Sequence, residues 1–201
     1  TIYHYIDCIL KCDHDIPVIS NTLANYLYAI KEKIDDCERD WDIFKKYTNP
    51  YEYVHGIVPL KKKSVSKYKP LSRSYFKMIE IMHSFRIEFQ SKHIRTFHLA
   101  EGPGGFIEAI ANMRNNVNDI YIGISLLDDK SDPNIPAWKK SQQFLNSHKN
   151  VYIETGADNT GNILTMENFE CCKENYASSM DLVTADGGFD FSMDFNKQEI
   201  N

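Results

Sequence analysis

The most constraining feature of this chain is an apolar run that meets a cluster of glycines and then a second apolar run. Residues 97–108 read Phe-His-Leu-Ala-Glu-Gly-Pro-Gly-Gly-Phe-Ile-Glu, which predicts a buried strand, a tight turn and the start of a helix. Gly102, Gly104 and Gly105 allow the backbone to turn sharply and to approach a ligand where a Cβ would clash. We therefore expect a nucleotide-cofactor loop here.

The same loop argues against a nicotinamide dinucleotide as the cofactor. Ile107 stands where the dinucleotide fingerprint requires its third glycine. That fingerprint also needs an acidic residue at the end of the next predicted strand, residues 120–126, where this chain has Ser125. An NAD-dependent oxidoreductase is therefore disfavoured, and another cofactor fits better.

A second informative segment, residues 180–190, is an apolar run that ends in Asp186 and two glycines. It predicts a buried parallel strand that carries Asp186 to the carboxyl edge of a sheet. Open α/β sheets bind their ligands at that edge.

Together, Gly-Pro-Gly-Gly-Phe at 102–106 and Ala-Asp-Gly-Gly-Phe at 185–189 resemble motifs of the FtsJ-like S-adenosylmethionine-dependent RNA ribose 2′-O-methyltransferases. The closest resemblance is to the cap-methylating branch, including enzymes of large DNA viruses, and it covers roughly residues 71–201. It implies an α/β fold with a Rossmann-like, mostly parallel sheet, flanking helices and S-adenosyl-L-methionine as the cofactor. It also implies RNA as the partner and substrate, and the cap-methylating branch implies the capped 5′ end of mRNA.

The resemblance assigns catalysis to Lys77 and Asp186. The apolar pattern predicts a helix over residues 71–90 with Lys77 off its apolar face, which alone would indicate an ordinary solvent-facing lysine. In the family, a helix just before the glycine loop carries the first lysine of a Lys-Asp-Lys-Glu set, and residues 72–78 are similar to that helix. A lysine with a lowered pKa can take the proton of a ribose 2′-hydroxyl, and Asp186 would orient it.

The resemblance also assigns a set of cofactor contacts. Backbone N–H groups of the glycine loop would meet the methionine carboxylate, Ser125, Asp128 and Asp129 are candidates beside the ribose, and Asp158 would accept from the adenine amino group. For Asp158 the alternative is a turn-stabilising role. The expected cofactor-binding residues are Glu101, Gly102, Pro103, Gly104, Gly105, Phe106, Ser125, Asp158 and Asp186.

No metal is required by this chemistry. Cys8, Cys12 and His14 could form part of a metal site, but a fourth ligand is not apparent. The five cysteines show no disulfide framework, and no signal peptide or membrane-length apolar run is visible. We expect a cytoplasmic protein, or one in a virion or viral factory, with no membrane and an unassigned oligomeric state.

Residues 1–70 form an expected N-terminal helical extension with a basic loop, and residues 71–201 the N-terminal part of the methyltransferase domain. Ser20 can cap a helix that runs to about Tyr47, with apolar residues spaced four and three apart. This seam at residues 20–47 would pack on the protein's own catalytic domain or, alternatively, bind a partner protein.

A basic loop follows between Asn49 and Pro70. Although the net charge is −5, a local basic track for RNA remains compatible with it. The alternative is a solvated loop without a ligand. The lysines that we expect to contact RNA phosphates are Lys61, Lys62, Lys63, Lys67 and Lys69.

The chain starts at Thr1 and ends fifteen residues after Asp186. Lys197 and Glu199 lie too close to Asp186 to supply the family's second lysine and its glutamate, so we expect part of a longer protein whose sheet is truncated after the fourth strand. The predicted function is 2′-O-methylation of the mRNA cap region. The alternatives are ribosomal or transfer RNA as the substrate, or a non-catalytic RNA-binding or scaffold subunit that keeps the fold.

Overall fold

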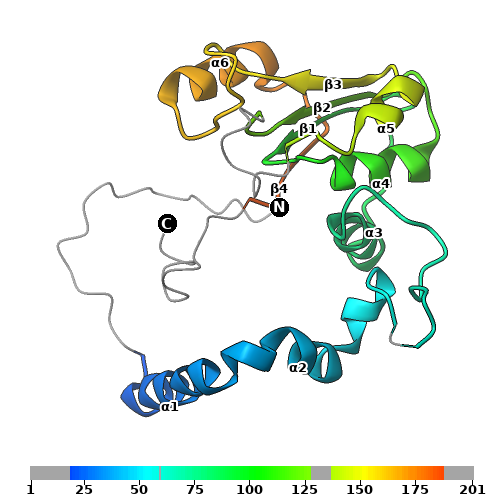
Figure 1. The fold of residues 1–201 in the computed structure, drawn as a ribbon. Coiled ribbons are helices and arrows are strands. Elements are labelled where there is room, and N and C mark those ends of the chain that lie inside the picture. The colour runs from blue at the N-terminus through cyan, green and yellow to red at the C-terminus, as the bar shows by residue number, and fades with distance from the viewer. Residues whose placement is uncertain (1–18, 59, 128–136, 188–201) are drawn as a thin grey trace. The chain divides into compact units, whose positions relative to one another are not determined.

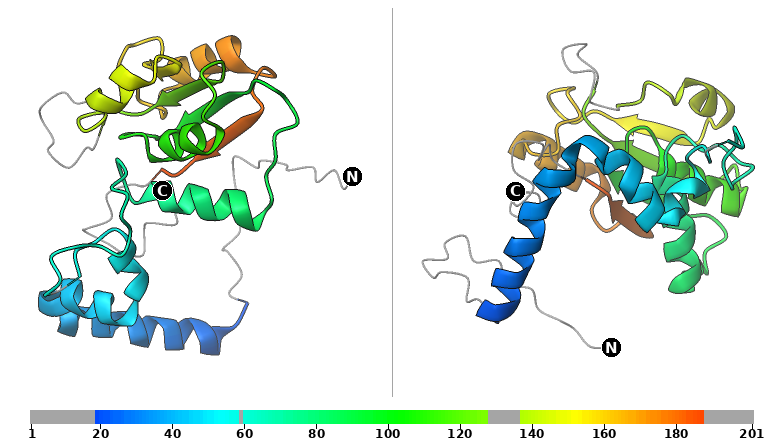
Figure 2. Two further views of the ribbon diagram at one scale, coloured as in Figure 1. Left: turned by 90° about the vertical axis from the view of Figure 1, so that its right-hand side faces the viewer. Right: turned by 60° about the horizontal axis from the view of Figure 1, so that its bottom comes forward.

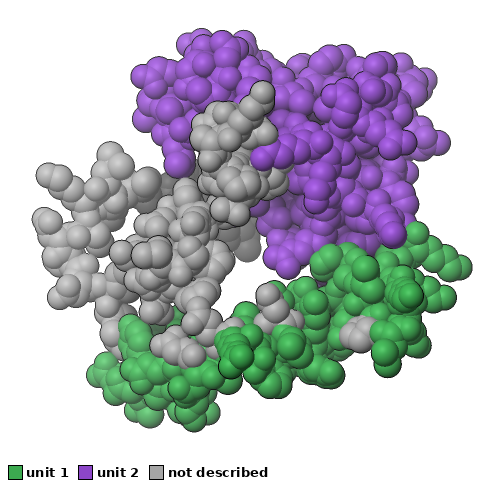
Figure 3. All heavy atoms as spheres, viewed as in Figure 1, with its two compact units in different colours: residues 1–67 green, residues 68–201 purple. Residues whose placement is uncertain are grey.

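The computed structural model describes residues 19–58, 60–127 and 137–187. Contacts divide the chain into two compact units, Thr1–Lys67 and Tyr68–Asn201, which are coloured separately in Figure 3. Several residues weighed from the sequence lie outside the described residues: Cys8, Cys12, His14, Asp128, Asp129, Gly188, Phe189, Lys197 and Glu199.

The second unit is built on a sheet of four parallel strands (Figure 1). Their order across the sheet is β3-β2-β1-β4, so the fold is the expected Rossmann-like α/β arrangement. The strands are β1 (Arg95–Leu99), β2 (Ile120–Ile124), β3 (Val151–Glu154) and β4 (Leu182–Ala185).

Helices cover both faces of this sheet (Figures 1 and 2). One face packs against α3 (Ser74–Ser84), α4 (Gly105–Arg114) and α5 (Gln142–Ser147), and the other against α6 (Met166–Tyr176). The buried side chains on the first face include Met78, Ile107, Ile110, Tyr121 and Phe144, and those on the second include Phe97, Ile122 and Ile124. β2, inside the sheet, is apolar throughout, as expected for a parallel strand buried on both faces. β1 also buries the polar Thr96 and His98, and the edge strands β3 and β4 leave Tyr152 and Val183 exposed.

Helix α3 is shorter than the apolar pattern predicted. It ends at Ser84, and the next residue, the apolar Phe85 within the predicted range 71–90, is 75% exposed. The physical reason is that Arg86 adopts a left-handed conformation with φ +48°, and the Ile87 N–H closes the end on the Met82 carbonyl at 3.0 Å.

In the first unit, the expected helix begins where it should but is not continuous. The Ser20 hydroxyl accepts the Leu23 N–H at 3.3 Å and caps α1 (Asn21–Lys31). A 3₁₀ segment, Glu32–Asp40, then separates α1 from α2 (Trp41–Thr48). Its sequence is rich in aspartate, which is a weak helix former, and three residues per turn shift the phase of the predicted seam. A second 3₁₀ turn, Pro50–Val54, lies inside the stretch expected to be a loop.

Candidate active site

The carboxyl ends of the four strands are aligned at one edge of the sheet. Leu99 of β1 pairs with both Ile124 and Ala185. Ile124 also pairs with Glu154, the last residue of β3. The segments that follow the strands therefore start at the same level, which is where parallel sheets build ligand sites.

The two glycine motifs found in the sequence are neighbours at this edge. A Cβ built on Gly187 would lie 3.3 Å from the Ala100 Cβ, so the turn after β4 runs beside the turn after β1. Gly104 has φ +110°, a backbone conformation that residues with a side chain rarely adopt. A Cβ on Gly102 would lie only 2.5 Å from the Ala137 carbonyl oxygen. The turn thus requires glycine at position 104 for the backbone conformation and at position 102 for close packing.

Glu101 is turned into the fold at the base of this turn. It is 6% exposed, and its Oε1 accepts the Ile107 N–H at 2.9 Å near the start of α4. Burial raises the pKa of Glu101 to about 8, although hydrogen bonds from the Ile107 and Phe106 N–H groups oppose this. Of the N–H groups that we expected near the cofactor, that of Phe106 is therefore already bonded to Glu101. The Phe106 side chain packs in the core, which leaves only its backbone near the turn.

The two residues assigned to catalysis meet at the carboxyl edge. Lys77 Nζ, from the first turn of α3, lies 2.8 Å from both Oδ1 and Oδ2 of Asp186, which follows β4. The residues are 109 positions apart in the sequence. Their side chains are 52% and 33% exposed, so the ion pair lies open to a ligand. The proximity required by the prediction is present, and the catalytic role itself stays a prediction.

Asp158 lies in the loop after β3, where it stabilises a turn. Its Oδ1 accepts the Thr160 N–H and the Asn168 side-chain amide, both at 2.8 Å, and hydrogen bonds from Thr160 and then Asn168 lower the pKa of Asp158. Among the described residues its Oδ2 has no hydrogen-bond partner and can still accept from a ligand. A Cβ on Gly161 would clash with the Ser125 carbonyl, so this loop packs against the end of β2. The turn-stabilising role is therefore present, and the adenine contact stays a prediction.

The five lysines of the predicted RNA track are all exposed. Lys61, Lys62 and Lys63 lie in a tight turn closed by the Val58 N–H, which donates to the Lys63 carbonyl at 3.0 Å. Lys67 ends the first unit, and Lys69 belongs to the second. Exposed lysines are compatible both with RNA binding and with a solvated loop that has no ligand, so the RNA contact stays a prediction.

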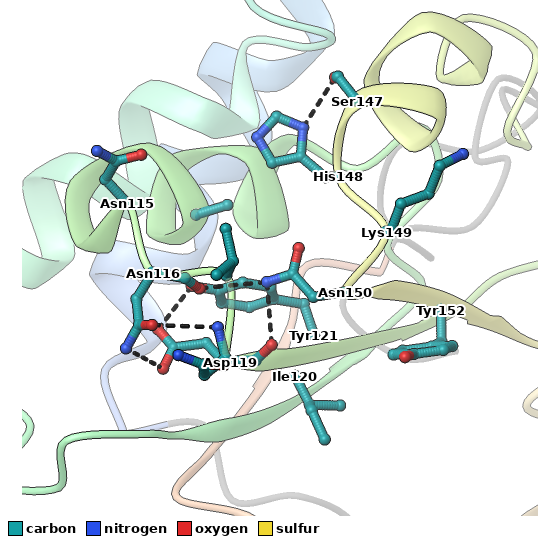
Figure 4. A pocket seen from close by; sticks show the side chains of 13 residues that line it. Asn115, Asn116, Asp119, Ile120, Tyr121, Ser147, His148, Lys149, Asn150 and Tyr152 are labelled. Carbon is teal, nitrogen blue, oxygen red and sulfur yellow. Dashed lines mark hydrogen bonds between the residues drawn. The ribbon is translucent and has the colours of Figure 1, made fainter.

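A pocket of about 460 Å³ lies at the opposite, amino edge of the sheet, where β2 and β3 begin (Figure 4). Its floor holds Asp119, which is fully buried and accepts hydrogen bonds from Arg114, from the Ile94 N–H at 3.0 Å and from the Tyr121 hydroxyl at 3.0 Å. Asn116 and Asn150 add further bonds around it. These polar groups bond one another, which indicates a structural network.

Sequence reasoning missed the residues that support the glycine turn. The Ser141 hydroxyl, fully buried, donates to the Pro103 carbonyl. Trp138 packs close to Gly104 and Gly123 and lies in a turn before α5. Neither residue stands in a motif, and only tertiary packing brings them to the turn.

Two further searches cover the described residues alone. Within them, no cluster of three or more histidine, cysteine or acidic side chains could hold a metal ion. None of their helices combines the length and the apolar character that crossing a membrane requires.

The chain is similar in sequence to known methyltransferases. The sequence profile of the FtsJ-like methyltransferase family matches residues 70–201. Cap-specific mRNA (nucleoside-2′-O-)-methyltransferase 2 from Drosophila melanogaster is 24% identical over 88% of this chain and 26% of its own length. The Mus musculus protein of that name is 26% identical over 88% of this chain and 24% of its own length, so the chain spans about a quarter of these relatives.

One solved structure is also similar. It is a Plasmodium falciparum chain provisionally described as a ribosomal RNA methyltransferase, with 24% identity and a TM-score of 0.36. The match covers 60% of this chain and 57% of that chain.

Proposed function

Because the chain belongs to the FtsJ-like methyltransferase family, we propose that it takes part in methyl transfer from S-adenosyl-L-methionine to a ribose 2′-hydroxyl of RNA. The observation that carries the proposal is the ion pair between Lys77 and Asp186, 2.8 Å apart at the carboxyl edge. Folding has brought together a lysine and a carboxylate that are far apart in the sequence, next to a glycine turn. That constellation suits a reaction that needs positioning and the removal of one proton.

The residues at this edge suit the proposed cofactor chemically. Asp186 can accept from an ammonium group, because a carboxylate has more acceptor sites than Lys77 uses. The Oδ2 of Asp158, which has no hydrogen bond from the part of the chain that the structure describes, can accept from an adenine amino group. Ser125 lies between the glycine turn and the Asp158 loop, and its hydroxyl would contact the ribose in this proposal. When bound, S-adenosylmethionine supplies a methyl group that its sulfonium has already activated.

The protein's part in the chemistry is to place the hydroxyl and to take its proton. Asp186 holds the Lys77 side chain, which would otherwise sample many rotamers, at the edge where the substrate binds. To take the 2′-hydroxyl proton, the Lys77 ammonium that pairs with Asp186 would first give up a proton to water, and Nζ would later release the hydroxyl proton to water in the same way. The oxygen freed of its proton would accept the methyl group that bound S-adenosylmethionine supplies.

We propose the cap region of mRNA as the substrate. Support comes from the names of the animal relatives and from the sequence motifs, at identities of 24–26%. The exposed lysines of residues 61–69 provide positive charge for an RNA backbone. A viral source stays a prediction from the motifs alone.

The test uses the full-length protein with S-adenosylmethionine carrying a labelled methyl group. Short RNAs that differ only in having a cap, or in a 2′-deoxy substitution at the first or second nucleotide, are compared as acceptors. We expect label transfer to capped RNA and its loss with a 2′-deoxy nucleotide at the target position. Equal transfer to uncapped ribosomal or transfer RNA would overturn the cap assignment. Cofactor binding without transfer to any RNA would leave the non-catalytic subunit as the function.

A further inference from the structure

A buried carboxylate on α4 holds the segment that leads into α3. Glu108 is only 5% exposed, and both of its oxygens are used. Its Oε1 accepts the Tyr68 hydroxyl at 2.6 Å, and its Oε2 accepts the Leu71 N–H at 2.8 Å. A buried carboxylate is costly unless hydrogen bonds satisfy it, so this one constrains its two donors strongly.

The attachment extends along α4. One turn beyond Glu108, the Asn112 side-chain amide donates to the Tyr68 hydroxyl at 3.1 Å. Burial, followed by the hydrogen bond to Glu108, raises the pKa of Tyr68 to about 12. The phenol therefore keeps its proton and remains a donor to Glu108 across the physiological pH range.

The start of α3 itself is seated against the start of α4. A Cβ on Gly105 would clash with the hydroxyls of Ser72 and Ser74 and would lie 3.0 Å from the Tyr75 nitrogen. Gly105 and Glu108 are three residues apart and so share one face of α4. Gly105, which has no side chain, thus leaves room for the start of α3, and the Glu108 carboxylate holds the residues just before it.

Lys77 lies in the turn of α3 that directly follows this attachment. Met78 and Met82 bury the next part of the helix in the core, so the helix would stay packed if the attachment were lost. The position of Lys77 Nζ over Asp186, however, depends on where the helix begins. A displacement of about 1 Å in a reacting group is enough to slow a reaction by roughly 10²-fold.

We propose that Glu108 is a positioning residue for the reaction: by anchoring Tyr68 and Leu71 to α4, it holds Lys77 on Asp186. This inference rests on the proposed function, because it gives Lys77 the catalytic part. The hydrogen bonds that Glu108 accepts come from Tyr68 and Leu71, just before α3, so it acts on Lys77 through the backbone that leads into this helix.

The test compares Glu108→Gln and Tyr68→Phe in the full-length protein, with capped RNA as the acceptor. A glutamine offers one oxygen to two donors, so we expect kcat to fall roughly 10-fold or more while the dissociation constant for S-adenosylmethionine is unchanged. Tyr68→Phe removes one of the two bonds and should cause a smaller loss. The double variant should be no slower than Glu108→Gln, because both changes break the same contact. Glu174→Gln, at an exposed position on α6, is the matched control.

The Lys77→Met background separates positioning from general structural support. There, Glu108→Gln should cause no further loss of turnover. Wild-type kcat in Glu108→Gln, or a further loss in that background, would overturn the proposal. If Glu108→Gln fails to fold, Tyr68→Phe takes its place: it should lower kcat in the wild-type background and cause no further loss in the Lys77→Met background. Full activity of Lys77→Met would instead refute the catalytic part of the proposed function.

Discussion

Two buried carboxylates, one at each edge of the sheet, have opposite electrostatic surroundings. At the amino edge, burial alone would raise the pKa of Asp119, but hydrogen bonds from Arg114, the Ile94 N–H and Tyr121 together lower it. At the carboxyl edge, burial raises the pKa of Glu101 to about 8, and the nearby Asp186 carboxylate adds to the effect. Asp119 thus has a cationic partner in Arg114, whereas Glu101 has none within residues 19–58, 60–127 and 137–187.

This contrast distinguishes polar groups that stabilise the fold from polar groups that are available to bind a ligand. The Asp119 network is closed, because each group in it bonds another group of the protein. Figure 4 shows the part of it that Asn116, Asp119 and Asn150 form. At the carboxyl edge, Lys77 and Asp186 stay partly exposed, and Asp158 keeps one oxygen unbonded among the described residues. Perturbed and incompletely paired groups gather where a protein binds or reacts. The pocket at the amino edge is therefore the weaker candidate for the active site.

Breaking the closed network should have the largest effect. Asp119→Ala leaves Arg114 and the Ile94 N–H without their acceptor, and we expect a loss of roughly 3–5 kcal/mol in the free energy of unfolding. Urea titration measures it. Asp36→Ala, at an exposed position of the first unit, should change stability by less than about 0.5 kcal/mol. Equal stability of the Asp119 variant and wild type would contradict the structural reading of this edge.

A substitution in the glycine turn should weaken cofactor binding at the carboxyl edge. Gly104→Ala forces a side chain onto a residue with φ +110°, at a cost of roughly 1–2 kcal/mol. We expect at least about 10-fold weaker S-adenosylmethionine binding by calorimetry, since 1.4 kcal/mol is tenfold. Thermal unfolding of the same variant shows how much of the cost falls on the fold. Unchanged affinity in a folded variant would remove this turn from the cofactor site.

The two carboxylates should also give opposite pH dependences. Between about pH 4.5 and about pH 8, folded protein retains a proton on Glu101 that unfolded chains have lost, so stability falls as pH rises through this window. The lowered pKa of Asp119 gives stability that is lost as pH falls below its ordinary value of 3.8. Urea titrations across the first window should show a downward slope that Glu101→Gln reduces and Glu174→Gln leaves unchanged. If the free energy of unfolding of Glu101→Gln fell with pH as steeply as that of the wild type, the pH dependence would come from other groups.

The smallest expected effect concerns the lysine track. If Lys61, Lys62 and Lys63 each neutralise one RNA phosphate, replacing all three with alanine should lower the salt slope of single-strand binding by roughly 0.7 per contact. Replacing Lys140, Lys149 and Lys173, which are exposed elsewhere, should leave the slope unchanged. The same slope in both triple variants would reduce residues 61–63 to a solvated turn.

The sequence predicted the parts of the site that local pattern determines. The strand–turn–helix at 97–114 and the strand ending before Asp186 are confirmed, because glycine clusters after apolar runs restrict the backbone strongly. The inward turn of Glu101 and the support from Ser141 were not predictable, since both depend on packing between distant segments. The seam at residues 20–47 was overextended, because apolar spacing alone does not register a 3₁₀ interruption.

The most direct test of the central claim is the turnover of Lys77→Met in the full-length protein. Methionine keeps much of the length and apolar contact of lysine but cannot take a proton. The account predicts a loss of about 10²-fold or more in methyl transfer to RNA, with S-adenosylmethionine affinity unchanged and with Lys173→Met, an exposed α6 control, fully active. Near-normal methyl transfer by Lys77→Met would contradict the assignment of Lys77 and Asp186 as the reaction centre.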